Sequence, residues 1–195
     1  DLQIGRGGSG NDTVTQNGGW GKDTQIANGD SGRDNIRQNG GFGSDTSVAN
    51  GGSGNDTLEG GTGNDTLVGG TGIDEVDYSF DSAGVAVNLA VGVATDGFGG
   101  VDTLIDVENV LGSDFDDQII GDEGANVLLG GLGNDVLIGG AGDDQIDGGA
   151  GDDILEGGAG DDLYIASAGN DAIITGGGSD TVQISSGYDQ FVDGA

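Results

Sequence analysis

The sequence predicts an all-β solenoid, and three features carry this prediction. A nine-residue unit recurs almost four times between Gly130 and Asp162: glycine-glycine-x-glycine-x-aspartate, then three residues with an apolar centre. A fixed period of this kind is the signature of a repeat architecture. Glycine accounts for 47 of the 195 residues and proline for none, which favours tight loops over helices. The apolar segments between the loops suffice for minimal strands.

The charge balance excludes several classes of function. The chain has 35 acidic and four basic residues and a formal net charge of −31, so it cannot bind nucleic acid through counterion release. No apolar run of about 18 residues is present, so no transmembrane segment is expected. The four basic residues, Arg6, Lys22, Arg33 and Arg37, all precede residue 40. The acidic stretch that follows therefore needs cations from solution to offset its self-repulsion.

The spacing of the loops divides the chain into two arrays and a connector. We expect a first array over 1–77, a connector over 78–111, a second array over 112–192 and a tail over 193–195. Loops of the first array begin at Gly7, Gly18, Gly29, Gly40 and Gly51, eleven residues apart, and then at Gly60 and Gly69, nine apart. Alternate loops resemble each other, which places successive units on opposite sides of a flattened coil. The connector has the alternation of short strands at 85–93 and one degraded repeat at 97–105.

In such a coil with two nonapeptides per turn, each loop of the second array stacks on the loop eighteen residues away. Asp135 then lies over Asp153, Asp144 over Asp162, and Asp153 over Asp171. The middle residue after each loop points into a thin core, as at Leu137, Ile146, Leu155, Tyr164 and Ile173. Stacked loops offer carboxylate and carbonyl oxygens, and Ca²⁺ takes six to eight such ligands. The alternative is that the aspartates only form Asx turns, but turns do not require aspartate at a fixed ninth residue.

Over nearly its whole length the chain resembles the RTX (repeats-in-toxin) family, whose loops carry the GGxGxDxUx pattern quoted above. This resemblance implies a right-handed parallel β-roll. The stacked pairs of loops in the two arrays allow about ten to twelve Ca²⁺ ions, which would offset most of the negative charge. The resemblance implies metal ligation by the sixth-position aspartates Asp12, Asp23, Asp34, Asp45, Asp56, Asp65, Asp74, Asp117, Asp135, Asp144, Asp153, Asp162, Asp171, Asp180 and Asp189. It also implies ligation by first- and third-position carbonyls, here those of Gly51, Gly60, Thr62, Gly130, Leu132, Gly139, Ala141, Gly148, Ala150, Gly157 and Ala159.

Some positions depart from the pattern. Asn126 replaces a sixth-position aspartate and Asp30 replaces a loop glycine. Metal sites are not expected with the same force beside Asn126 or at the ends of the arrays. The fifth-position aspartates Asp143, Asp152 and Asp161 are expected to face solvent. We expect Trp20 and Phe42 to stack on each other, with a sugar or a partner protein as the alternative.

One row of apolar residues in the second array is expected to face outward: Ile120, Val136, Ile138, Ile154, Ala172, Ile174 and Val192. Contiguous apolar surface usually marks an interface, so self-association or packing of another domain is expected there. The alternative is that the roll is flattened or rotated so that these residues belong to the core.

Three functions from different classes fit the sequence. The first is a calcium-binding module of a larger secreted bacterial protein, which the family resemblance connects with type I secretion and with folding in external calcium. The second is an adhesive or carbohydrate-binding module, similar to the repeats beside alginate epimerases. The third is an enzyme, which the absence of histidine and cysteine argues against, since nucleophilic catalysis then lacks its activating base. We favour the first and expect no enzymatic activity.

Overall fold

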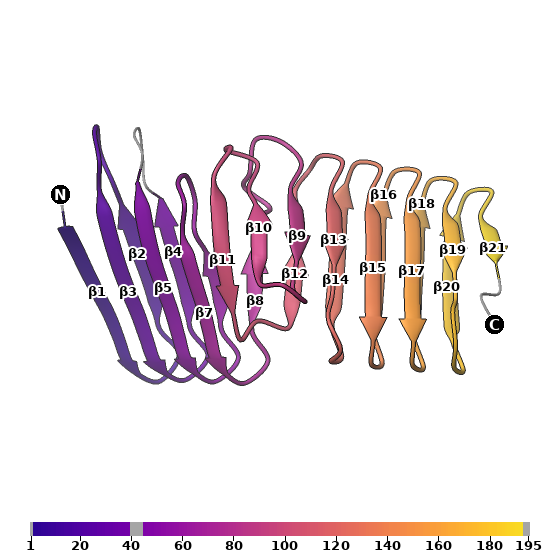
Figure 1. The fold of residues 1–195 in the computed structure, drawn as a ribbon, viewed down its shortest axis with the longest axis horizontal. Helices are drawn as coiled ribbons and strands as arrows, with labels where there is room; N and C mark the ends of the chain where they lie inside the picture. Colours follow the sequence, from indigo (N-terminus) through magenta and orange to yellow (C-terminus); the bar gives the residue numbers. More distant parts are fainter. Residues whose placement is uncertain (1, 40–44, 193–195) are drawn as a thin grey trace. The chain divides into compact units, whose positions relative to one another are not determined.

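The structure, a computed structural model, describes residues 2–39 and 45–192 as strands joined by turns (Figure 1). Contacts divide the chain into two compact units. Unit 1 comprises Asp1–Tyr78 and Gly92–Val107, and unit 2 comprises Ser79–Val91 and Glu108–Ala195. In the described part of the chain there is no helix, and hence none with the length and apolar character that a membrane crossing requires. The predicted all-β solenoid is confirmed.

Unit 1 contains two rows of strands whose neighbours are separated by one turn of the coil. The first row runs β1 (Leu2–Ser9), β3 (Thr24–Ser31), β5 (Thr46–Ser53), β7 (Thr66–Thr71), β11 (Val101–Ile105) and β10 (Val93–Thr95). The second row runs β2 (Thr13–Asn17), β4 (Asn35–Asn39), β6 (Thr57–Glu59) and β8 (Glu75–Asp77). Neighbours pair in parallel, except that β10 and β11 are antiparallel.

Unit 2 repeats this arrangement with shorter turns. One row runs β9 (Ala86–Asn88), β13 (Gln118–Ile120), β15 (Val136–Ala141), β17 (Ile154–Ala159), β19 (Ala172–Ile174) and β21 (Gln190–Val192). The other runs β12 (Asn109–Leu111), β14 (Val127–Leu132), β16 (Gln145–Ala150), β18 (Leu163–Ala168) and β20 (Thr181–Ser186). All of these neighbours pair in parallel, and Figure 1 shows the strands of each row side by side.

The core of unit 2 is one side chain thick. The residues predicted to point inward, Leu137, Ile146, Leu155, Tyr164 and Ile173, are all 0% exposed. The prediction of three-residue strands is wrong for β14 to β18, which have six residues each. Pairing continues into the next loop because the second glycine and the third residue stay in register, as with Gly131 on Gly149 and Leu132 on Ala150. In β14 the first-position glycine, Gly130, faces inward and is buried.

The first turns of unit 1 have a partly polar core that the sequence analysis did not anticipate. Eleven-residue spacing lengthens the strands, and the extra inward positions are occupied by glutamine. Gln16 is 6% exposed, and Gln25 and Gln38 are 0% exposed. Gln38 stacks in register on Gln16, and Gln25 Nε2 donates to the carbonyl of Asn39 at 2.9 Å.

The segment between the arrays contributes turns to both units. Thr103–Ile105 of the expected degraded repeat pairs in parallel with Thr66–Val68, so it forms the next turn of unit 1. In unit 2, the inward residues Val85 and Val87 are buried, and β12 pairs in parallel with β14.

The apolar row predicted to face outward occupies outward positions of β13, β15, β17, β19 and β21. Ile154 is 44% and Val192 is 55% exposed, and the other members are half-buried. Glu156 interrupts the row, because it stands in register between Ile138 and Ile174. Trp20 is 87% exposed, and Phe42, its expected stacking partner, lies outside the described residues.

Candidate metal centre

The predicted sixth-position aspartates stand where each loop enters a strand, on the inner side of the loop. Asp23, Asp34, Asp45, Asp56, Asp65, Asp74, Asp117, Asp135, Asp144, Asp153, Asp162 and Asp171 are at most 3% exposed. Asp12, Asp180 and Asp189 are half-buried. Burial of so many carboxylates is costly unless each finds hydrogen-bond donors or a cation.

One carboxylate oxygen of each aspartate holds two turns together. Asp135 N–H donates to Asp153 Oδ1 at 2.8 Å, Asp144 N–H to Asp162 Oδ1 at 2.9 Å, and Asp153 N–H to Asp171 Oδ1 at 3.0 Å. These are the three pairs that the eighteen-residue spacing predicts to stack. In unit 1 the same bond joins Asp12 to Asp34 and Asp34 to Asp56, at 2.8 Å each. Oδ1 is therefore a structural acceptor throughout the ladder.

The other oxygen, Oδ2, has no such role in most loops. It is buried and has no hydrogen-bond partner in Asp12, Asp34, Asp45, Asp56, Asp65, Asp135, Asp144, Asp153 and Asp171. An unpartnered buried carboxylate oxygen costs free energy comparable to the desolvation of a charged group. Its recurrence at one loop position means that these oxygens share one environment, in which a proton or a cation could offset this cost.

The space in front of Oδ2 is lined by oxygen and closed by glycine. A Cβ built on Gly130 would collide with Asp135 Oδ2 and would lie 2.5 Å from the carbonyl oxygen of Gly148, one turn further on. At Gly139 it would collide with Asp144 Oδ2 and lie 2.8 Å from the carbonyl oxygen of Gly157. No side chain fits at this first position. Hard oxygens converging without a donor are the ligands that Ca²⁺ prefers.

The loop backbone takes a shape that favours glycine at two further positions. Gly131 has φ 112° and Gly133 has φ 116°, in a region that residues with a Cβ rarely adopt. Asp30, the predicted departure, occupies the second loop position with φ 76°. It therefore takes the left-handed conformation of the glycine that it replaces.

Burial raises the pKa of several stacked carboxyls because desolvation disfavours the charged form. Burial is the largest cause at Asp135, whose pKa rises to about 7, and at Asp144 and Asp153, whose pKa values rise to about 6. The negative charges of stacked aspartates add to this rise, and the backbone N–H bonds oppose it. At Asp65, burial and the charges of Asp102 and Asp96 raise the pKa to about 8. A bound cation would stabilise the charged form of these carboxyls and so lower their pKa values.

The predicted carbonyl ligands lie along the same loops. The first-position residues Gly51, Gly130, Gly139, Gly148 and Gly157 each direct a carbonyl toward the first glycine of the preceding turn, and Gly60 lies against Asp65 Oδ2. Among the third-position residues, the carbonyls of Ala150 and Ala159 accept backbone N–H bonds from Gly133 and Gly142 at 2.9 Å. Leu132 and Ala141 end β14 and β15, and Thr62 lies in the loop between β6 and β7.

Several loops differ from this pattern, and in one of them Asp23 Oδ2 accepts from Gly19 N–H at 2.9 Å. Asn126 is fully paired: its Oδ1 accepts from Asp122 N–H at 2.9 Å and its Nδ2 donates to the Glu108 carbonyl at 2.7 Å. Asp117 Oδ2 accepts from Ser113 N–H at 2.6 Å, and its Oδ1 accepts from Val85 N–H at 2.7 Å. Tyr164 O–H lies 3.5 Å from Asp162 Oδ2. Carboxylate or amide oxygens in these loops already have donors.

The fifth-position residues form a second, exposed ladder. Asp143, Asp152 and Asp161 are exposed as predicted, but each also accepts a backbone N–H from the next turn. Asp161 N–H donates to Asp143 Oδ1 at 2.9 Å, and Ser179 N–H donates to Asp161 Oδ1 at 2.8 Å. These residues hold the turns together from outside.

Two aspartates of the same environment were missed by the sequence analysis. Asp102 occupies the sixth position of the degraded repeat, and Asp65 N–H donates to its Oδ1 at 2.9 Å. The sequence GFGGVD at residues 97–102 places Asp102 at the sixth position of a degraded loop, and this spacing could have identified it. Asp96 also has a buried Oδ2 with no partner, but it precedes the loop and no period marks it.

Within residues 2–39 and 45–192, no three acidic side chains gather closely enough to hold a metal by themselves. An ion in these loops therefore needs backbone carbonyls beside the carboxylates, and the geometry at Gly130 and Gly139 supplies both. The residues present fit Ca²⁺.

Comparison with known families agrees with this chemistry. The model of the RTX calcium-binding nonapeptide repeat (4 copies) matches residues 39–76, 96–137, 111–146, 129–164 and 156–191. Comparison with curated protein sequences finds no match.

Proposed function

Because the chain belongs to the family of RTX calcium-binding nonapeptide repeats, we propose that its stacked loops hold Ca²⁺ with the residues described above. The chain is a calcium-binding β-roll module, and modules of this family are in general structural or calcium-binding rather than catalytic. The observation that carries the assignment of ligands is the unpartnered Oδ2 of the sixth-position aspartates, facing a glycine carbonyl of the next turn.

In each site the aspartate supplies charge and the backbone supplies the remaining oxygens. Asp135 Oδ2 and the Gly148 carbonyl line one such space, and Asp144 Oδ2 and the Gly157 carbonyl line another. The first-position glycine leaves the room that an ion needs. When bound, Ca²⁺ supplies the positive charge that these oxygens lack and links one turn of the roll to the next.

Folding and calcium binding form one event in this proposal. About ten to twelve divalent ions offset most of the net charge of −31. Without them, the fold stacks buried carboxylates about 4.8 Å apart, one strand spacing, with no compensating cation. A structure whose ligands are assembled only by folding gains its binding free energy as folding free energy.

We also propose that the module belongs to a larger secreted bacterial polypeptide and leaves the cell by type I secretion. Calcium sites of extracellular modules have Kd values of about 10⁻⁴ to 10⁻³ M, so they stay empty at cytoplasmic calcium and fill outside the cell. A chain that folds only after export is consistent with this difference in calcium concentration between the cytoplasm and the exterior.

A matched pair of substitutions tests the assignment of ligands. Asp153→Asn replaces the unpartnered Oδ2 by an amide and keeps Oδ1 as an acceptor, whereas Asp152→Asn makes the same charge change at an exposed fifth position. Changes in the residues that support metal ligands cost 10- to 100-fold in affinity, so we expect Asp153→Asn to weaken calcium binding by at least about tenfold at its sites. Asp152→Asn should leave affinity nearly unchanged.

Isothermal titration calorimetry of both variants with calcium gives the comparison, and magnesium serves as the control ion. Equal calcium affinities for the two variants would contradict the proposed ligand set. Binding of magnesium as tight as that of calcium would contradict the calcium assignment.

A further inference from the structure

Asp96 shows the signature of the proposed ligands but lies outside the repeated loops. It is 3% exposed, and its Oδ2 is buried without a hydrogen-bond partner, as in Asp135, Asp144 and Asp153. It stands just before the loop 97–102 of unit 1, at a position that has no counterpart in the nonapeptide.

In the loop that follows Asp96, the sixth-position aspartate, Asp102, has a hydrogen-bond donor on its second carboxylate oxygen, unlike most of the repeats. Tyr78 O–H donates to Asp102 Oδ2 at 3.3 Å, so the second oxygen of this sixth-position carboxylate is engaged by a protein donor. At Asp96, Oδ1 accepts from Phe98 N–H at 3.0 Å and from Gly100 N–H at 2.5 Å. These two bonds fix the carboxylate and leave Oδ2 directed at the loop backbone.

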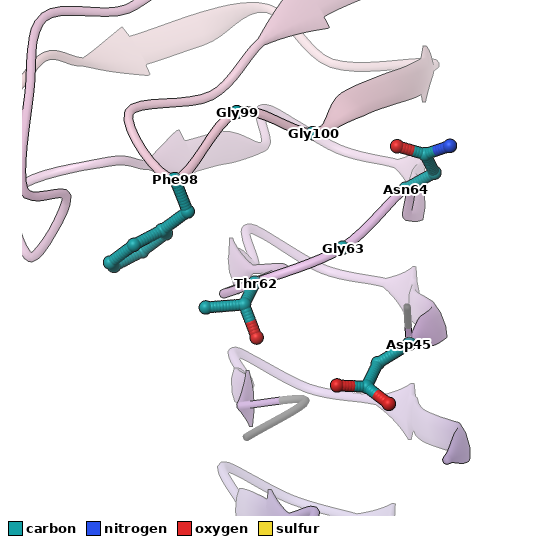
Figure 2. Close-up of a pocket in the computed structure, with 7 residues that line it drawn as sticks. All are labelled: Asp45, Thr62, Gly63, Asn64, Phe98, Gly99 and Gly100. Carbon is teal, nitrogen blue, oxygen red and sulfur yellow. The ribbon is translucent and has the colours of Figure 1, made fainter. Parts of the chain in front are cut away.

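Oxygens from two turns converge beside Gly100. A Cβ built on this residue would lie 2.6 Å from Asp96 Oδ2 and would collide with the carbonyl oxygen of Gly63. Figure 2 shows Gly99 and Gly100 stacked on the segment Thr62–Asn64. These loops border a pocket of about 220 Å³, which gives solvent access to them. Only glycine leaves this space open.

A purely structural role of Asp96 does not explain why its second carboxylate oxygen, Oδ2, is buried without a hydrogen-bond donor. Oδ1 alone makes both turn-forming hydrogen bonds, so a neutral residue such as asparagine would hold the loop equally well. The buried charge on Oδ2 instead adds to the repulsion in this region, because Asp65 lies near enough to feel the charge of Asp96. An unpaired buried charge of this kind needs either a proton or a cation to offset it.

We propose that Asp96 Oδ2 and the Gly63 carbonyl bind an additional Ca²⁺. This ion fastens the segment 92–102 onto the loop 60–65 of unit 1. The proposal rests on the proposed function, since it assumes that the loops of this chain take calcium.

Native mass spectrometry of the full chain in calcium counts the bound ions one by one and tests this proposal. Asp96→Asn keeps the Oδ1 acceptor and removes the charge, and Asp106→Asn is the matched control, an exposed aspartate four residues after this segment. We expect the Asp96→Asn protein to bind one ion fewer than the wild-type protein and the Asp106→Asn protein to bind the same number. Equal counts in the two variants would overturn the proposal.

The wild-type count separates this proposal from the broader one. A wild-type chain that binds no calcium overturns both, whereas a wild-type chain that binds many ions, with an unchanged count in Asp96→Asn, overturns only the site at Asp96. A crystal of the wild-type protein grown in calcium makes the test independent of the folding of any variant. Anomalous density at about 2.3–2.6 Å from Asp96 Oδ2 supports the site, and its absence there overturns it.

Discussion

At the scale of single residues, Asp30 and Asp106 are the non-glycine residues with positive φ in the described part of the chain, and Asp30 is the one that replaces a loop glycine. Its φ of 76° costs a residue with a Cβ roughly 1–2 kcal/mol, although aspartate tolerates this region better than most. We expect Asp30→Gly to raise the free energy of unfolding in calcium by about 0.5–1 kcal/mol, because glycine adopts this φ without strain. Urea denaturation measures the change.

Asp30→Asn is the control for this prediction. It removes the same charge but keeps a Cβ, so it should stabilise the protein less than Asp30→Gly does. Equal stabilities for the two variants would assign the effect to charge instead of backbone conformation.

The sixth-position aspartates could be predicted residue by residue, because the nine-residue period fixes which carboxylate stacks on which. Asp96 could not, since it lies outside the period and its environment depends on where Gly63 and Gly100 meet. Nor does a period reveal that Asn126, Asp117 and Asp162 have donors on their side-chain oxygens. Those donors come from Asp122, Ser113 and Tyr164, none of which the repeat specifies as a partner.

At the scale of strands, one inward residue per nonapeptide carries the core. Leu155 is 0% exposed in β17, whereas its neighbour Ile154 is 44% exposed on the outer face of the same strand. We expect Leu155→Ala to lower the free energy of unfolding in calcium by about 2–5 kcal/mol, because it removes a fully buried side chain and leaves a cavity.

Ile154→Ala is the matched control. It should lower the free energy of unfolding much less than Leu155→Ala does, since a partly exposed side chain loses little burial. Chemical denaturation of both variants at saturating calcium measures the difference. Similar losses for the two variants would contradict the inward and outward assignment of β17.

Strand lengths and the polar core of unit 1 were harder to predict. Alternation from Val14 and Ile36 places Gln16 and Gln38 inward, although glutamine is rarely found fully buried. The six-residue strands of unit 2 arise because Gly131 and Gly149 pair across the loop, and glycine has a low strand propensity.

At the scale of the whole chain, the raised pKa values predict how the metal-free protein responds to acid. The carboxyls of Asp65, Asp135, Asp144 and Asp153 have folded-state pKa values of about 8, 7, 6 and 6, above the ordinary value of 3.8. Protonation therefore favours the fold, and this stabilisation is lost as the pH rises through these values. We expect acidification from pH 8 to pH 5 in chelator to increase the β-structure of the chain.

Far-UV circular dichroism in calcium-free buffer measures this response, and saturating calcium provides the comparison. In saturating calcium we expect acidification to reduce the β-structure instead, because protons compete with the ion for the same oxygens. Loss of β-structure on acidification in chelator would contradict the prediction.

The coupling of folding to calcium is tested most directly by a calcium titration of the wild-type chain at pH 7.5, followed by far-UV circular dichroism with magnesium as the control. The unpartnered Oδ2 atoms predict a disordered chain in chelator and a cooperative transition to β-structure at micromolar to millimolar calcium, with no transition in magnesium. A chain already fully β-structured in chelator, and unchanged on addition of calcium, would contradict this account. The aspartate ladder would then hold the turns together through Oδ1 alone.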